Sequence, residues 1–312
     1  MANTPRNDRI AGRDMTVPMP SSPSGSKVPP EFQAFVDARG HPAIFFFVMD
    51  MSIGLRHVLE LRKALKGCMF DEVDLVINSG GGNIDSAYQI VELVRLHATK
   101  VNACIPFYAK SAATLICIGA DSIILDELAQ LGPLDAQIAE AEQGSTQDYT
   151  YVSALNPFKS LEELQSNATE ALDLAVMMIA VRSGMNLDIC IKHAIQFVHA
   201  TSGPLFTQLR AEKLGEYSRA LSVGQEYAKR LLQRYNGWDL TKSSEIAQKL
   251  VFGYPSHEYI IDHYELMEMG LPVELFSLNE RDAVEDLIYK QCAKQQTVIH
   301  LVTPSSMPHD NP

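Results

Sequence analysis

The sequence lacks a long hydrophobic run. Its most apolar early stretch, Ala43–Met49, is 7 residues long, whereas a helix needs roughly 20 apolar residues to cross a bilayer. No long apolar run follows the few charges near the N-terminus, so we do not expect a cleaved secretory signal. These absences lead us to expect a cytoplasmic protein without stable membrane insertion.

Positive charge is also scarce. The chain has 26 Lys and Arg against 38 Asp and Glu, which gives a formal net charge of -12 and a pI near 5.2. Phosphate backbones and anionic lipid surfaces attract basic proteins, not acidic ones. A nucleic acid is therefore not expected as a partner.

Cysteine is sparse and unpatterned. The five cysteines are odd in number and scattered through apolar segments, with no CxxC pair and no Cys/His cluster at zinc-ligand spacing. We expect free thiols in a reducing compartment, no metal site and no organic cofactor.

The sequence contains enough hydrophobic residues to form a buried core, since they make up 46% of its 312 residues. Residues 1–30 are rich in Pro, Ser, Asn and Gly, which predicts a disordered N-terminal tail. A main domain is expected over 31–280, with a helical addition at about 156–250. Residues 281–312 then form a C-terminal extension, in which Val298–Val302 could add an edge strand.

Strand-like and helix-like patterns alternate in the first half of the main domain. This alternation predicts α/β architecture, with βα units on a mostly parallel sheet. The expected strands are Ala43–Met49, Val73–Ile77, Val101–Phe107 and Ser122–Leu125, and the expected helices are Gly54–Lys66, Ile84–His97 and Ser111–Gly119. Long helices are expected afterwards at Leu161–Arg182, Asp188–Val198, Phe206–Glu216 and Gly224–Tyr235.

A glycine run, Gly80–Gly82, stands where the second predicted strand ends and a helix begins. Consecutive glycines adopt backbone angles closed to other residues, so several N–H groups can turn toward one anionic point. Such a loop can serve as an oxyanion hole. It can equally be a tight turn or a phosphate-binding loop, although neither nucleotide fingerprint, GxGxxG or GxxxxGK[ST], is present.

A serine, Ser111, follows the next predicted strand and opens a helix, with Ala112 and Ala113 after it. At that corner its hydroxyl projects at the carboxyl edge of the sheet, where the small neighbours admit a substrate chain. Taken alone, the position of Ser111 predicts a helix N-cap. The pairing of this serine with a glycine run at the same sheet edge is what indicates a nucleophile beside an oxyanion hole.

These segments resemble the ClpP/crotonase-like superfamily, and within it the serine dehydrogenase proteinase family, which is related to signal peptide peptidase A. The resemblance covers roughly residues 31–275. It is carried by Ile77–Asn83, Ser111, Gly119–Ile123, Leu131–Gln137, Tyr254–Tyr259 and Gly270–Val273. It implies a βαβ spiral core, a homo-oligomer, a serine peptidase acting on peptides or proteins, Ser111 as nucleophile and Gly80, Gly81 and Gly82 as oxyanion donors.

A serine hydroxyl needs a neighbouring base, either His held by a carboxylate or a Lys kept neutral by burial. The ClpP resemblance implies a histidine one strand and a turn after the serine, but Leu131–Ile138 contains none. The signal peptide peptidase resemblance implies a Ser-Lys dyad instead. Lys159 follows Ser111 by 48 positions, and shielding by Phe158 would favour its neutral form. We therefore expect Lys159 to be the general base of Ser111, with a solvated lysine at a helix start as its alternative role.

Two further residues remain open as base or groove residues. His257 lies in a segment that carries the resemblance and could act as base, line the groove or be structural. Asp135 could orient a base or be a turn residue after Pro133. Lys110 adjoins the serine and is expected to point away from it.

Two rival functions are compatible with the same motifs. A crotonase-like enzyme would use paired amides to stabilise an acyl-CoA enolate, but no carboxylate acid/base or adenine pocket can be located for it. A non-catalytic scaffold would keep the fold without a working base.

Overall fold

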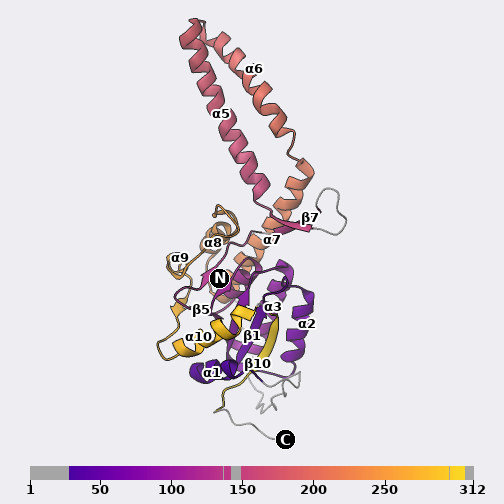
Figure 1. The fold of residues 1–312 in the computed structure, drawn as a ribbon, viewed down its shortest axis with the longest axis vertical. Helices are drawn as coiled ribbons and strands as arrows, with labels where there is room; N and C mark the ends of the chain where they lie inside the picture. Colours follow the sequence, from indigo (N-terminus) through magenta and orange to yellow (C-terminus); the bar gives the residue numbers. More distant parts are fainter. Residues whose placement is uncertain (1–27, 136, 142–148, 295, 306–312) are drawn as a thin grey trace, which may run out of the picture.

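The computed structural model describes residues 28–135, 137–141, 149–294 and 296–305. It shows an α/β body from which a long helical hairpin projects (Figure 1). Most of the expected N-terminal tail, residues 1–27, lies outside the described residues. Among those described, no helix combines the length and hydropathy needed to span a bilayer.

The body is built on one main sheet with the strand order β10-β1-β2-β3-β5-β9. Its strands pair in parallel except β10, which runs antiparallel to β1 at the edge. The strands are β1 (Ala43–Val48), β2 (Phe70–Ser79), β3 (Ala98–Ile105), β5 (Ser122–Leu125), β9 (Val273–Leu275) and β10 (Val298–Val302). In addition, β4 (Tyr108–Ala109) pairs with β2, and β6 (Gln130–Leu131) pairs with β4.

Helices cover both faces of this sheet. The helices of the body are α1 (Pro30–Arg39), α2 (Leu55–Ala64), α3 (Ile84–His97), α4 (Ala112–Ile118), α8 (Leu240–Phe252), α9 (His263–Glu268), α10 (Arg281–Lys290) and the 3-10 turn η1 (Cys292–Lys294). The α/β class with a parallel sheet and a large helical addition is therefore confirmed.

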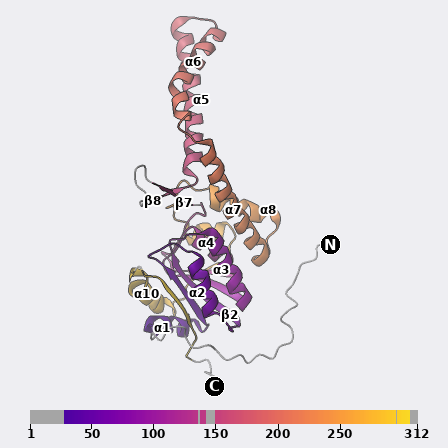
Figure 2. The ribbon, with the colours of Figure 1, turned by 90° about the vertical axis from the view of Figure 1, so that its right-hand side faces the viewer.

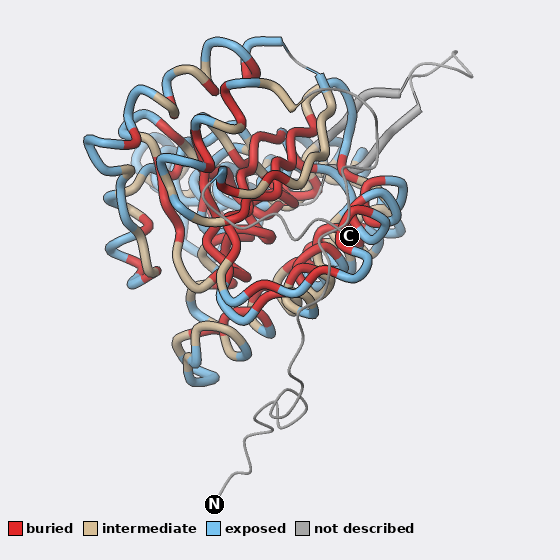
Figure 3. Tube along the Cα trace, turned by 90° about the horizontal axis from the view of Figure 1, so that it is seen from below, coloured by how far each residue is buried: buried red, intermediate tan, exposed pale blue. Residues whose placement is uncertain are grey.

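Strand β1 shows why the sheet is buried on both sides. Its residues are all apolar and all buried, as expected of a central parallel strand. Side chains alternate between faces along a strand, so Ile44 and Phe46 join the core under α2, α3 and α4. Phe45 and Phe47 join a second core under α1 and α10, where Phe32 stacks on Phe45 with ring centroids 3.9 Å apart. Figure 3 shows the buried residues concentrated at the centre of the body.

The projecting hairpin consists of α5 (Asn156–Ser183) and α6 (Leu187–Phe206), and α7 (Ala211–Tyr235) runs from it back to the body (Figure 2). The sequence predicted two helices, Phe206–Glu216 and Gly224–Tyr235, where the structure has the single helix α7. Phe206 instead ends α6. Gly224 lies inside α7 and does not end it; a Cβ there would lie 3.4 Å from the Leu134 carbonyl oxygen, an ordinary contact distance.

Other elements differ from the expectation only at their edges or were not anticipated. The strand at Val298–Val302 has the predicted bounds. Helix α1 and the antiparallel pair β7 (Gln137–Ala141) and β8 (Tyr149–Ser153) had not been predicted. The division into a main domain and a C-terminal extension stays a prediction.

Candidate active site

The structure brings the glycine run and Ser111 together at one edge of the sheet. Strand β2 ends at Ser79, and β4 lies parallel to it with Ala109 opposite Ser79. The amide of Lys110 donates to the carbonyl of Ser79 at 3.0 Å. The residues that follow each strand, Gly80 and Ser111 among them, are thereby placed side by side.

The glycine loop touches the serine corner so closely that side chains are excluded. A Cβ added to Gly81, whose φ is +104°, would lie 2.7 Å from Cβ of Ser111 and 2.6 Å from the Lys110 carbonyl. A Cβ added to Gly82, whose φ is +148°, would lie 2.3 Å from the amide nitrogen of Ile53. Both glycines are therefore required by close backbone approach as well as by their dihedral angles.

Ser111 itself has a strained backbone. Its φ of 52° and ψ of -122° match the first central position of a type II′ turn, where glycine is the usual residue. The hydrogen bond from the Ala113 amide to the Lys110 carbonyl, 3.0 Å, closes this turn. Among the described residues other than glycine, Ser111 alone has a positive φ. Strain of this kind concentrates at functional sites.

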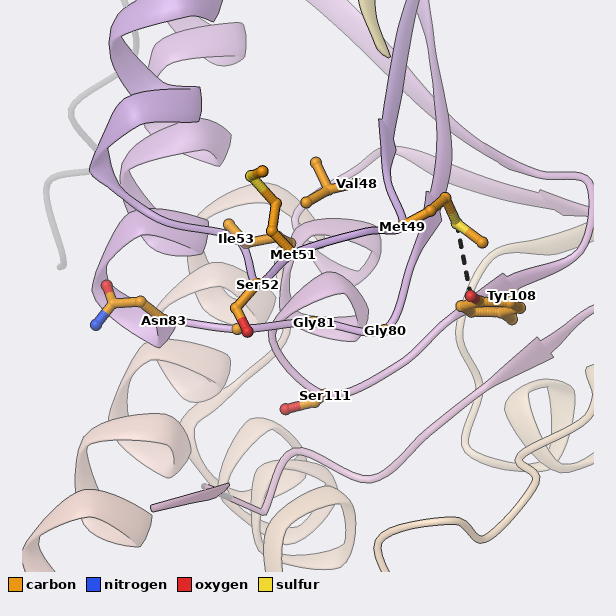
Figure 4. Close-up of a pocket in the computed structure, with 11 residues that line it drawn as sticks. Val48, Met49, Met51, Ser52, Ile53, Gly80, Gly81, Asn83, Tyr108 and Ser111 are labelled. Atoms are coloured by element: carbon orange, nitrogen blue, oxygen red, sulfur yellow. Dashed lines mark hydrogen bonds between the residues drawn. The ribbon is translucent and has the colours of Figure 1, made fainter. Parts of the chain in front are cut away.

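The side chain of Ser111 does not act as a helix cap. It occupies the N-cap position of α4 but makes no capping hydrogen bond. Instead Ser111, which is 8% exposed, lines a cavity of about 460 Å³ together with Gly80–Gly82, Asn83 and residues of the loop after β1. Figure 4 shows Ser111 next to the Gly81 backbone, with its hydroxyl directed to the side away from Tyr108.

Ser79 is part of this site although its side chain is fully buried. The amide of Gly81 donates to Oγ of Ser79 at 3.1 Å. This bond fixes the direction of the Gly81 N–H group. An oxyanion that accepts from the same N–H would share it with Oγ of Ser79. The sequence analysis gave Ser79 no role, although it lies in the segment Ile77–Asn83, directly before the glycine run.

A histidine–carboxylate pair lies at the same edge. Nδ1 of His257 and Oδ1 of Asp135 are 2.7 Å apart, and the other oxygen of Asp135 accepts a hydrogen bond from the Ser153 hydroxyl. Asp135 is 1% exposed and the His257 side chain 11%. Within the described part of the chain, no residue hydrogen-bonds Nε2 of His257.

Local pairing explains how two residues 122 positions apart meet beside the serine corner. Strand β6 lies parallel to β4 with Leu131 opposite Ala109. Leu131 also forms an antiparallel bridge with Ile261: the Ile261 amide donates to the Leu131 carbonyl at 3.0 Å, and the Leu131 amide donates to the Ile261 carbonyl at 2.9 Å. The chain before Ile261 and the chain after Leu131 therefore run side by side, which places His257 against Asp135.

His257 and Ser111 face adjoining cavities. A cavity of about 430 Å³ is lined by His257, Lys110, Gly80 and Tyr108, among others. Gly80 and Tyr108 also line the cavity that contains Ser111. The imidazole of His257 therefore lies on the other side of Gly80 and Tyr108 from the cavity that contains Ser111.

The two candidate lysines are both ion-paired. Lys159 lies in the first turn of α5, where Nζ is 3.3 Å from Glu162 and the side chain is 47% exposed. The shielding expected from Phe158 is therefore incomplete. Lys110 pairs with Glu258 at 3.0 Å, in agreement with the expectation that it points away from the serine.

The wall between the loop after β1 and the serine corner is held by Asn78, another buried residue that sequence reasoning missed. Its Nδ2 donates to Sδ of Met49 at 3.0 Å, and its Oδ1 accepts from the Tyr108 amide at 3.2 Å. An asparagine inside an otherwise apolar strand end was the available signal. As for a metal, no group of three or more His, Cys, Asp or Glu side chains with ligand geometry occurs among the described residues.

A family model described as ClpP-like SDH-type serine proteinase matches residues 46–153. The matched segment contains the glycine run, Ser111 and Asp135, whereas Lys159 and His257 lie beyond it. The match confirms the family resemblance over that segment.

Two curated proteins of Methanocaldococcus jannaschii, both named as uncharacterized, are similar to this chain. One is 25% identical over 250 residues, which are 78% of this chain and 68% of the relative. The other is 27% identical over 201 residues, which are 64% of this chain and 51% of the relative. The chain thus spans about half the length of the second relative.

Among solved structures, a mutant of the membrane-bound stomatin-specific protease 1510-N is similar to this chain. The alignment covers 79% of this chain and 85% of the other, with 12% identity and a TM-score of 0.42.

Proposed function

We propose that this chain, whose residues 46–153 belong to the ClpP-like SDH-type serine proteinase family, is a serine peptidase that cleaves peptide bonds with Ser111 as its nucleophile. One observation carries the proposal. Ser111 is held in a strained turn, free of any capping bond, with its Cβ pressed against the backbone of Gly81. A serine that served only as a helix cap would make the capping bond and would not need the strained turn.

The proposed reaction is acyl transfer. The base takes the hydroxyl proton of Ser111 as its oxygen attacks the peptide carbonyl carbon, and backbone amides of Gly80–Gly82 stabilise the oxyanion of the tetrahedral intermediate. The amine leaves with a proton from the base, and water then hydrolyses the acyl-enzyme. This chemistry requires no metal or organic cofactor.

For the base, the geometry favours His257 with Asp135 as its partner. A carboxylate that accepts from Nδ1–H orients the imidazole, keeps the Nε2 tautomer able to accept a proton and stabilises the imidazolium that forms. The 2.7 Å contact between His257 and the buried Asp135 fits this role. It differs from the ClpP pattern in chain order, because the histidine follows the carboxylate by 122 positions.

Lys159 is the second candidate base, as a Ser-Lys dyad. A lysine acts as a base when burial keeps it neutral, and the exposed pairing of Lys159 with Glu162 does not supply that burial. We therefore rank it behind His257.

A fluorophosphonate probe tests the proposal directly, because it reacts covalently with an activated serine. We expect specific labelling of the wild-type chain and none in Ser111→Ala. Absence of labelling in a correctly folded wild-type protein would overturn the proposal. It would leave the crotonase-like acyl-CoA enzyme or the non-catalytic scaffold, of which only the former would bind acyl-CoA.

We also propose that the protein forms a homo-oligomer in the cytoplasm. Helix α5 is 28 residues long and contains no buried residue. Large apolar side chains, including Met177, Val181 and Phe197, are exposed along the hairpin. Exposed apolar side chains gathered on one projecting element are typical of protein interfaces, so the hairpin is the proposed site of self-association.

A further inference from the structure

We propose that a second cavity beside the catalytic one is a specificity subsite for a large apolar side chain of the bound peptide. The inference rests on the proposed peptidase function and adds to it the class of substrate. The cavity, here called the side pocket, lies between Tyr108 and the C-terminal helix α10. Its lining residues include Phe107, Leu128, Ile288, Tyr289 and Ala293.

The side pocket is large enough for an aromatic or branched aliphatic side chain. Its volume is about 610 Å³, compared with about 460 Å³ for the cavity that contains Ser111. Ligand pockets of proteins commonly have volumes of roughly 300–1,000 Å³ and are lined mainly by apolar groups with a few polar ones. The side pocket fits this description in both size and lining.

The side pocket and the catalytic cavity share a wall. Met49 and Tyr108 line both cavities, and the Tyr108 hydroxyl lies 3.5 Å from Sδ of Met49 (Figure 4). Asn78 holds this wall from behind through its bonds to Met49 and to the Tyr108 amide. A peptide that places its carbonyl at Ser111 therefore passes the mouth of the side pocket, within reach of a neighbouring side chain.

The apolar groups of the side pocket remain in solvent in the free protein. Phe107 is 40% exposed, Tyr289 76% and Leu128 82%. Single exposed apolar residues are ordinary, but these three come from separate elements and converge on one cavity next to the nucleophile. Burying them against a substrate side chain would supply binding free energy at roughly 25 cal/mol per Å².

Charges at the rim further restrict the substrate. Asp126, Glu127 and Glu285 line the side pocket, and among the described residues only Glu127 of these three has a cationic partner, Arg281 at 2.7 Å. The rim therefore carries an excess of negative charge, which repels acidic residues. The favoured substrate has a large apolar residue for the side pocket and no acidic residue beside it.

Part of the side pocket is outside the segment that defines the family. Arg281–Lys290 of α10 and Cys292–Lys294 of η1 follow residue 153, where the family match ends. The proposed preference therefore belongs to this chain and does not follow from its membership of the family.

Peptidyl phosphonates that differ at one residue test the inference, because they react with the nucleophile without needing turnover. We expect Leu or Phe at the best position next to the phosphonate to give an inactivation rate at least about tenfold above Ala, and Glu to be slowest. Tyr289→Ala and Leu128→Ala are expected to reduce the Leu-to-Ala ratio at least threefold. The control Tyr264→Ala, an exposed tyrosine of α9, should leave that ratio unchanged.

A simple alkyl fluorophosphonate separates the two ways in which the test can fail. If this reagent labels Ser111 but the peptidyl series shows no preference, or Tyr289→Ala and Leu128→Ala leave the preference intact, the side pocket is not a subsite although the peptidase function stands. If the simple reagent also fails with folded protein, the proposed function fails and the inference with it.

Discussion

Cβ of Ser111 lies only 2.7 Å from the position that a Cβ on Gly81 would occupy. A side chain at position 81 would therefore overlap Ser111. The two residues come from loops after different strands, and their contact ties the geometry of the nucleophile to that of the glycine run. Each loop therefore restricts what the other can tolerate.

The first prediction concerns Gly81→Ala. We expect it to destabilise the protein by about 1–3 kcal/mol, because it combines a positive φ with overlap of the Ser111 corner, and to abolish labelling of Ser111 by fluorophosphonate. Thermal unfolding and probe labelling measure the two effects. Gly80→Ala is the matched control, since a Cβ there meets nothing within 4 Å; equal damage by both variants would contradict this account.

The second prediction concerns strain at Ser111. Glycine adopts the φ of 52° and ψ of -122° without steric cost, whereas alanine does not. Ser111→Gly should therefore be more stable than Ser111→Ala by about 1 kcal/mol, after allowing for the extra freedom of glycine in the unfolded chain. Urea unfolding of both variants checks this. A less stable glycine variant would show that the turn is not strained.

The third prediction concerns the base. Asp135→Asn and His257→Gln should each slow labelling of Ser111 by about 10²–10⁴-fold, because the imidazole loses its orientation or is absent. Labelling kinetics at constant pH, with folding checked by circular dichroism, provide the measurement. Lys159→Ala should label at the wild-type rate; if it is inactive while His257→Gln is active, the Ser-Lys dyad replaces the proposed pair.

The fourth prediction concerns acid stability. Burial alone would raise the pKa of Glu280, but hydrogen bonds from Arg39 and Ser277 outweigh it and hold that pKa below the ordinary 4.5. A group with a lowered folded pKa binds fewer protons in the folded state at acidic pH, so its stabilisation is complete above about pH 4.5 and lost as the pH falls through the folded value.

Glu280→Gln should accordingly lower the free energy of unfolding by about 1–2 kcal/mol at pH 7, since Arg39 loses one of its two carboxylate partners and keeps Asp74. The difference from wild type should shrink toward pH 3. Urea unfolding across this range measures it, with the exposed Glu163→Gln as control. A difference that stays constant with pH would rule out the ion pair as its source.

The fifth prediction concerns the helical hairpin. Val181→Glu and Phe197→Glu should reduce the molar mass of the oligomer in light scattering, because each puts a charge into the proposed apolar interface. Helix content should be unchanged, since both side chains are exposed. Leu96→Glu, an exposed leucine of α3 in the body, should leave the mass as in wild type. A monomeric wild-type protein would exclude self-association through the hairpin.

The sequence by itself determined the elements that depend on short-range pattern. Ile84–His97 and Ser122–Leu125 have the predicted bounds, because amphipathic spacing and β-branched runs act locally. The juxtaposition of Gly80 with Ser111 was also predictable, since loops after neighbouring parallel strands must emerge at the same edge.

The tertiary structure decided what depends on residues far apart in the chain. His257 meets Asp135 only because Ile261 bridges Leu131, a contact that no local pattern encodes. Lys159 lies on an exposed first turn of α5, although Phe158 had indicated shielding, because the exposure of a side chain is set by what packs on its helix. Local sequence pattern was therefore enough to predict Ser111 and the glycine run at one edge of the sheet. The residues that lie around them depend on contacts between distant parts of the chain.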